Sequence, residues 1–324
     1  MTIVPGFFDK AYSSINRMVH EGWAVLAPGS YAKHYYEKAT NKKLDLKDPK
    51  DFNEKIQWLK IYSDITLWTD LADKFKVREY IKCCGLSDIL VTLYGVWEQA
   101  EDIDFNLLPD RFVLKTNNSC GRVILVKDKS QLDIDETREL LNRWVKEKKG
   151  LISFEPHYWN IERRIIAEEL LQDNSTKVFS SSLIDYKFWC INGEPFIIMI
   201  LYDRNTMTIG SMEEDNSSHV RASVYDLAWN LRPEIIAGPL ANDMPLEIPK
   251  PKCFEEMKAI CRILSKPFPQ VRVDLYEVNN IVYFGELTFT PGGGMDYFTP
   301  EYFMEMGHKM DLSTVKRRSK RFII

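Results

Sequence analysis

Residues 271–294 have the sequence VRVDLYEVNNIVYFGELTFTPGGG, which contains two runs of alternating apolar and polar residues. This period of two is typical of β-strands with one buried face. Asn279 and Asn280 stand between the two runs, and asparagine tolerates the left-handed backbone conformation found in tight turns. The stretch therefore predicts a β-hairpin.

The predicted hairpin carries charged residues on one face. With a three-residue loop, Asp274 lies opposite Glu286 and Arg272 opposite Thr288, and the Cβ atoms of such pairs are about 5 Å apart. Two carboxylates this close repel each other, so they need a cation or a shared proton. Carboxylate oxygens completed by substrate phosphates suit Mg²⁺. A charged strand face in water stays open as the alternative, and a two-residue turn would separate the carboxylates onto opposite faces.

The composition is that of an ordinary globular protein, with 45% hydrophobic and 28% charged residues among 324. This length is enough for two or three compact units. The net charge of -4 argues against a nucleic-acid-binding protein, which usually has a basic excess. Six cysteines occur without a CxxC pair, which predicts reduced thiols in a cytoplasmic protein and no zinc site.

No apolar run approaches the roughly 18 to 20 residues that cross a bilayer, and the start of the chain lacks a signal-peptide pattern. Two features leave a peripheral contact at the inner face of the membrane open: an amphipathic stripe near the N-terminus and the basic sequence KRRSKRFII at 316–324. The stripe consists of Phe7, Phe8, Tyr12, Ile15, Val19 and Trp23. An ordinary docking helix and a solvated tail are the alternative, which we favour.

Residues 1–110 have mainly helical patterns and form the first of three expected segments. Asp51 and Glu54 make a capping box ahead of one helix. A second helix is expected from about Asp70 to Cys84, with a glycine after it.

Residues 111–172 are expected to form a β-β-α-β subdomain. Two strands flank a polar loop at 116–121, a helix follows over about 135–148, and residues 163–171 form a short apolar strand.

Residues 173–324 form the third expected segment. Asn192-Gly193 between two apolar runs is a strong hairpin signal. Residues 203–250 have no clear pattern, and helices are expected near 253–266 and 299–310. Antiparallel hairpins with helices on one side predict an α+β fold.

Three further positions carry polar residues suited to ligands. Lys115 ends an apolar strand ahead of the polar loop, and backbone amides beside an ammonium group can hold a polyphosphate. Lys74 and the pair Glu168-Glu169 are the other two. Each has an ordinary alternative. Lys115 can extend over a surface turn, Lys74 can be a solvated helix residue, and Glu168-Glu169 can cap the end of a strand.

Taken in order, these pieces resemble the ATP-grasp superfamily and, more narrowly, its TupA-like branch, which is often found with bacterial surface-polysaccharide genes. The resemblance covers about residues 50–310. It rests on the ordered motifs FNEKIQWLK, LADKFKVREY, DRFVLKTNNSCG, RRIIAEELL, DYKFWCINGEPF and RVDLY…YFGELTFTPGGG. It implies an ATP-grasp fold in which two α+β subdomains clasp ATP, a lid at 111–172 and a catalytic subdomain at 173–324.

The resemblance implies a nucleotide site. Lys74 and Lys115 match the two lysines that bind phosphate oxygens, and Asp185 matches the acid that holds the ribose hydroxyls. The hinge that receives the adenine is matched by Glu168, Glu169, Leu170 and Leu171.

The resemblance also implies a metal site and a catalytic arginine. Asp274 and Glu286 match the Mg²⁺ carboxylates, and Arg272 matches the arginine that supports the transferring phosphoryl group. Thr288 stands where the family usually has asparagine, and its hydroxyl can still bind Mg²⁺. The loop after Lys115 is poor in glycine, and a helical segment replaces the usual N-terminal Rossmann-like domain.

The activity that the resemblance implies is ATP-dependent ligation of a carboxylate to an amine through an acyl phosphate. No enzyme nucleophile is needed, in agreement with a sequence that has no such motif. The TupA-like branch suggests a glycan carboxylate, such as a uronic acid, and an amino acid. The alternatives are an ATP-grasp kinase that phosphorylates a sugar hydroxyl, and a glycosyltransferase or glycan-binding protein.

Overall fold

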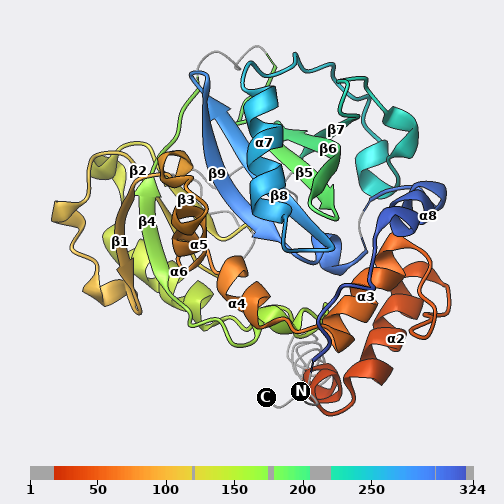
Figure 1. The fold of residues 1–324 in the computed structure, drawn as a ribbon. Helices are drawn as coiled ribbons and strands as arrows, with labels where there is room; N and C mark the ends of the chain where they lie inside the picture. Colours follow the sequence, from red (N-terminus) through yellow and green to blue (C-terminus); the bar gives the residue numbers. More distant parts are fainter. Residues whose placement is uncertain (1–17, 119–120, 174–178, 205–219, 296, 319–324) are drawn as a thin grey trace, which may run out of the picture.

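The computed structural model of the chain describes residues 18–118, 121–173, 179–204, 220–295 and 297–318. Two antiparallel sheets with helices packed against them confirm the expected α+β fold (Figure 1). Within these ranges, no helix is long and apolar enough to span a membrane. The expected stripe from Phe7 to Ile15 and the last six residues of the tail lie outside the described residues.

The smaller sheet has four strands in the order β1-β4-β2-β3, and all its pairings are antiparallel. Its strands are β1 (Leu93–Trp97), β2 (Phe112–Thr116), β3 (Val123–Val126) and β4 (Ile165–Glu169). Helix α6 (Ile134–Lys146) buries Leu141 and Trp144 in one apolar cluster with Phe112 and Leu114 of β2. The β-β-α-β order of β2, β3, α6 and β4 agrees with the sequence pattern.

The larger sheet has five strands in the order β7-β6-β5-β8-β9. Its strands are β5 (Asp185–Ile191), β6 (Glu194–Tyr202), β7 (Arg221–Tyr225), β8 (Gln270–Val278) and β9 (Ile281–Thr288). Helix α7 (Phe254–Ser265) lies across one face of this sheet (Figure 1) and shares a core with Val271, Val273 and Leu275 of β8. Because side chains alternate along a strand, Arg272 and Asp274 point to the opposite face.

The helical part packs against one end of the larger sheet. Residues 18–26 are helical, and the other helices are α2 (Pro28–Thr40), α3 (Phe52–Tyr62), α4 (Thr66–Ala72), α5 (Val77–Cys83) and α8 (Pro300–Lys309). The expected capping box begins α3: Asp51 accepts from the Glu54 amide at 2.8 Å, and the Glu54 carboxylate accepts from the Asp51 amide. Phe52 of α3 stacks on Phe303 of α8, with ring centroids 6.5 Å apart.

Short 3-10 turns complete the described chain. They are η1 (Ser87–Ile89), η2 (Ala100–Asp102), η3 (Phe105–Leu107), η4 (Lys129–Gln131), η5 (Pro156–Tyr158), η6 (Pro233–Ile235), η7 (Gly238–Ala241) and η8 (Pro291–Gly293).

The single helix expected from Asp70 to Cys84 is wrong, because the chain forms α4 and α5 with a turn between them. Asp73 leaves helical geometry at ψ 113°, and its carboxylate accepts the amides of Phe75 and Lys76. Aspartate competes for backbone amides in this way and so starts a new helix. Strands β1 and β7 were not predicted either.

Candidate active site

The β8–β9 hairpin brings the two predicted carboxylates together by a route that differs from the expected one. Its turn has two residues, Asn279 and Asn280, which both have positive φ. That turn alone would place Glu286 on the other face, but the register shifts at Gly285, and Asp274 then pairs with Glu286. A Cβ at Gly285 would lie 3.0 Å from the Asp274 carbonyl oxygen, so glycine suits this close approach.

Arg272 lies at the centre of the resulting polar cluster. Its Nε and Nη2 donate to the two Asp274 oxygens at 2.7 Å each, a planar two-point contact. The same Nη2 lies 3.2 Å from Glu286 Oε1 and 3.0 Å from Thr288 Oγ1. The guanidinium also covers the Trp189 ring, with its carbon 5.5 Å from the centroid. One positive group therefore contacts both facing carboxylates and the threonine.

Strand β5 adds a lysine that the sequence analysis missed. Lys187 pairs in register with Asp274, and its ammonium contacts Asp274 Oδ2 and lies 2.7 Å from Asp185 Oδ2. Arg204 reaches the same Asp185 oxygen at 3.1 Å. The alternation of Asp185 and Lys187 at the start of a predicted strand was the available signal.

The charges of this cluster set the ionisation of its carboxylates. Burial favours a raised pKa at Glu286, but the charges of Lys74, Lys187 and Arg272 outweigh burial and hold its pKa far below the usual value. Burial raises the pKa of Asp274, and Arg272 and Lys187 oppose that rise.

The turn between α4 and α5 links the cluster to the smaller sheet. Lys74 Nζ lies 3.0 Å from Glu286 Oε2 on β9. One helical turn later, Arg78 Nη1 lies 3.6 Å from Glu168 Oε1 on β4. The backbone amide of Lys74 also donates to the Asn117 carbonyl at 3.0 Å. This turn therefore contacts both sheets.

On the smaller sheet, Lys115 of β2 contacts the carboxylate of Glu168. Glu169, the next residue on β4, instead accepts from the Thr92 hydroxyl at 2.7 Å and is exposed to solvent at that bond. Leu170 and Leu171 follow β4 and are partly buried. Glu168 thus belongs with Lys115, whereas Glu169 points elsewhere.

Asn117, which the sequence analysis did not select, fixes the base of the polar loop after β2. Its side chain donates to the Glu162 carbonyl at 2.8 Å and accepts the Arg164 amide at 2.8 Å, and the residue is fully buried. Thr116 and Asn118 beside it are buried as well, while Ser119 and Cys120 of this loop lie outside the described residues.

The oxygen donors in the cluster fit a magnesium ion. Asp274 and Glu286 face each other, and one nitrogen already lies 2.7 and 3.2 Å from an oxygen of each. Mg²⁺ is usually held by one or two carboxylates together with substrate phosphates. Among the described residues, no group of three or more His, Cys, Asp or Glu side chains could hold a metal ion.

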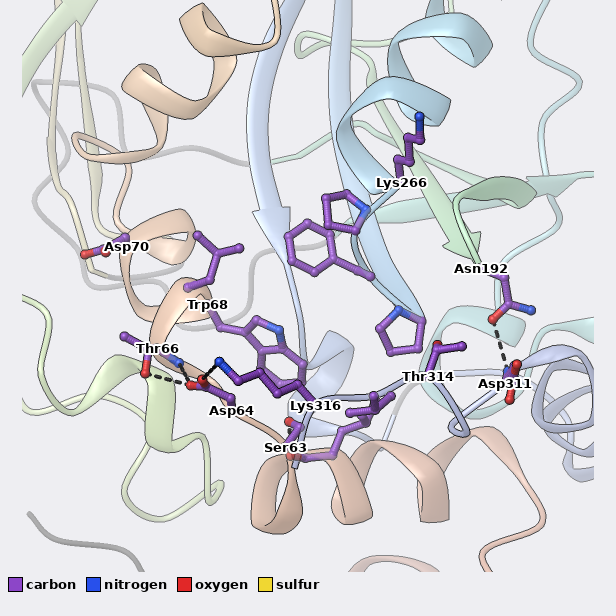
Figure 2. A pocket seen from close by; sticks show the side chains of 16 residues that line it. Ser63, Asp64, Thr66, Trp68, Asp70, Asn192, Lys266, Asp311, Thr314 and Lys316 are labelled. Atoms are coloured by element: carbon purple, nitrogen blue, oxygen red, sulfur yellow. Dashed lines mark hydrogen bonds and ion pairs between the residues drawn. The ribbon is translucent and has the colours of Figure 1, made fainter. Parts of the chain in front are cut away.

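A separate pocket of about 720 Å³ lies near the turn after α7 (Figure 2). Trp68, Phe268 and two prolines line it, together with Asp64 and Lys316, which are paired at 3.7 Å (Figure 2). None of the predicted site residues lines this pocket.

A family model described as TupA-like ATPgrasp matches residues 54–310 of the chain. No curated protein sequence matches it. Among solved structures, D-alanine–D-alanine ligase from Bacillus anthracis is 14% identical, with 77% of this chain and 70% of that chain covered and a TM-score of 0.46. N5-carboxyaminoimidazole ribonucleotide synthetase in an ADP complex is 13% identical, with 74% and 51% covered and a TM-score of 0.43. L-amino acid ligase from Bacillus licheniformis is 14% identical, with 71% and 43% covered and a TM-score of 0.40.

Proposed function

The chain belongs to the TupA-like ATP-grasp family, and from this we propose that it is an ATP-dependent carboxylate–amine ligase. The observation that carries the proposal is the position of Arg272, which contacts Asp274, Glu286 and Thr288 at once. Such a cluster combines oxygens of a kind that suits a metal ion with a fixed positive group, and both support a role in phosphoryl transfer.

In the proposed reaction, a substrate carboxylate oxygen attacks the γ-phosphorus of ATP, and the bond to the ADP oxygen breaks. An amine nitrogen then attacks the carbonyl carbon of the acyl phosphate. The carbon–oxygen bond breaks, inorganic phosphate leaves, and the amine loses a proton to solvent. The products are an amide, ADP and phosphate.

We assign Lys74 and Lys115 to the phosphate oxygens of ATP. Each ammonium group now pairs with a carboxylate, Lys74 with Glu286 and Lys115 with Glu168. A triphosphate carries more negative charge than either carboxylate, so we expect both ammonium groups to turn toward it. Lys187 offers a third cation on the same side as Asp274.

We assign the adenine to the hinge formed by Glu168, Glu169, Leu170 and Leu171, and the ribose hydroxyls to Asp185. Asp185 is buried, and its Oδ1 has no hydrogen-bond partner among the described residues. A buried carboxylate oxygen of this kind gains by accepting a hydroxyl.

Asp274, Glu286 and Thr288 would hold Mg²⁺, which neutralises phosphate charge when it is bound. Arg272 keeps its charge at any working pH and can donate to two oxygens of a phosphoryl group. The two hydrogen bonds that Arg272 donates to Asp274 fix the orientation of its guanidinium group.

We propose a glycan carboxylate such as a uronic acid as one substrate and an amino acid as the other, in bacterial surface-polysaccharide assembly in the cytoplasm. This part of the proposal follows from the family association alone.

The test is a matrix of acids and amines incubated with ATP and Mg²⁺, with ADP release and product mass recorded. The ligase requires ADP release that depends on both substrates and an amide product. A phosphorylated sugar would identify a kinase, and a glycosidic product from a nucleotide sugar would identify a glycosyltransferase. Either result would overturn the proposal.

A further inference from the structure

Lys60, in the middle of α3, has a side chain that is completely buried. Its amino group donates to the carbonyl of Gly293 at 2.5 Å, to the carbonyl of Ser153 at 3.3 Å and to Gln57 Oε1 at 3.2 Å. The three acceptors come from three separate parts of the chain. Lys60 therefore joins α3 to two loops that are distant in sequence.

Burial of an amino group costs free energy unless the group is hydrogen-bonded. The three hydrogen bonds that Lys60 donates offset this cost. All three acceptors in contact with it are uncharged, and Glu155 is the nearby carboxylate that acts on it through charge. The rings of Tyr35 and Phe154 lie 5.5 and 5.9 Å away. Burial lowers the pKa of Lys60 to about 7, and the amine can donate in either protonation state.

The first loop held by Lys60 runs over residues 290–294, directly after β9. Its three glycines have φ of 56°, 67° and 79°, a conformation in which side chains are strained. A Cβ at Gly293 would lie 2.8 Å from the hydroxyl of Tyr35, and one at Gly294 would lie 2.6 Å from Gln57 Nε2. The loop is therefore packed closely against α2 and α3.

The second loop runs over residues 147–164, which link α6 to β4 in the smaller sheet. Glu155 in this loop accepts from the Thr290 hydroxyl and from the Ser153 hydroxyl, each at 2.5 Å. A second bond thus joins the same two loops beside Lys60. These hydrogen bonds connect the loop that follows β9 in the larger sheet to the loop that precedes β4 in the smaller sheet.

We propose that Lys60 is a positioning residue for phosphoryl transfer: it holds Gly293 and Ser153 together and so fixes the end of β9, with Glu286 and Thr288, relative to the smaller sheet. The role rests on the proposed function. None of the three acceptors of Lys60 is Glu286 or Thr288, and Lys60 acts on them through the four residues between Thr288 and Gly293.

The test compares Lys60→Met with Lys55→Met on the same helix. Lys55 also donates to two carbonyls, those of Gly307 and Met310 at 2.7 Å each, but these lie at the C-terminal end of α8. For Lys60→Met we expect kcat per folded molecule to fall about tenfold or more, while the Kd for ATP changes less than about threefold. Lys55→Met should lose stability without a loss of kcat per folded molecule.

Amide hydrogen exchange supplies a readout that needs no turnover. Lys60→Met should exchange faster by about tenfold in both 288–294 and 151–155, because one bond to each loop is lost. If Lys60→Met fails to fold, Thr290→Val is the second variant. It removes the hydrogen bond from Thr290 to Glu155 and leaves Lys60 in place, and it should produce faster exchange in the same two loops.

Unchanged exchange in both loops, or equal kcat per folded molecule in the Lys60 and Lys55 variants, would overturn the positioning role. An absence of ATP-dependent turnover in the unmodified protein would instead contradict the proposed ligase function, and the exchange data would still decide the role of Lys60.

Discussion

Asp274 lies directly opposite Glu286 because Gly285 adds one residue to β9. The pair shares Arg272, and each carboxylate has a lysine of its own, Lys187 on Asp274 and Lys74 on Glu286. We propose that this site exchanges its internal ion pairs for a metal ion and phosphates when ATP binds.

Asp274→Asn and Glu286→Gln should each abolish turnover, because each keeps the shape of the side chain and removes a charge offered to the metal. Melting temperatures should stay close to that of the unmodified protein. Glu194→Gln is the matched control, since its carboxylate pairs with Arg262 at an exposed position and belongs to no part of the proposed site. Normal activity of both site variants at low Mg²⁺ would refute the metal assignment.

Lys74→Ala and Lys115→Ala should weaken ATP binding more than they lower stability. A charge-assisted hydrogen bond contributes about 1.5 to 3 kcal/mol, which corresponds to roughly ten- to a hundred-fold in affinity. Isothermal calorimetry measures the change, with Lys82→Ala as a control because Lys82 pairs with Glu79 at an exposed position. If neither site variant altered the Kd, the phosphate assignment would be wrong.

Arg272→Lys should lower kcat far more than it raises the KM for ATP. Lysine keeps the charge but loses the planar fork that contacts Asp274, Glu286 and Thr288 together. That fork matters most as charge develops in the transition state. A purely structural arginine predicts a lower melting temperature with a normal kcat per folded molecule, so kinetics and a thermal melt together decide.

Lys60 should make stability depend on pH in the alkaline range. Burial lowers its pKa to about 7 from 10.5, so between these values the unfolded chain binds a proton that the folded chain does not. The free energy of unfolding should therefore rise with pH above about 7, by at most about 1.4 kcal/mol per pH unit, relative to Lys60→Met.

His157 and Tyr35, which lie near Lys60, have pKa values outside the range from about pH 7 to pH 9. Burial lowers the pKa of His157 to about 3, and burial raises that of Tyr35 to about 12. Denaturant unfolding of both proteins between about pH 7 and 9 measures the difference. Parallel curves for the two proteins would show that the Lys60 amine does not titrate there.

Period-two alternation and turn residues were enough to predict both hairpins and the α+β fold. They could not give the register of β8 and β9, because that depends on the bulge at Gly285 as well as on the turn. A glycine inside a strand pattern is a bulge signal, and it was present in the sequence. Strands β1 and β7 are no shorter than β2 and β4. The pairing of β1 shifts between Leu93 and Gly95, and β7 lies within residues 203–250, where the sequence has no clear pattern.

The candidate site was predictable where a residue lies within a motif and obscure where it depends on a distant partner. Lys187 becomes a member of the cluster only because β5 pairs with β8. Asn117 gains its role from bonds to Glu162 and Arg164, which no local pattern indicates. The turn at Asp73 places Lys74 within reach of Glu286. It could not be predicted, because it depends on the hydrogen bonds that the Asp73 carboxylate accepts from the amides of Phe75 and Lys76.

The central claim is that a substrate carboxylate is activated as an acyl phosphate. The most direct test uses the acid and amine that the substrate matrix identifies, with both carboxylate oxygens of the acid labelled with oxygen-18. Phosphate is collected and its mass measured. The account predicts one labelled oxygen in each inorganic phosphate released, because the bond from that oxygen to carbon breaks when the amine attacks. Unlabelled phosphate, with all of the label retained in the organic product, would contradict it.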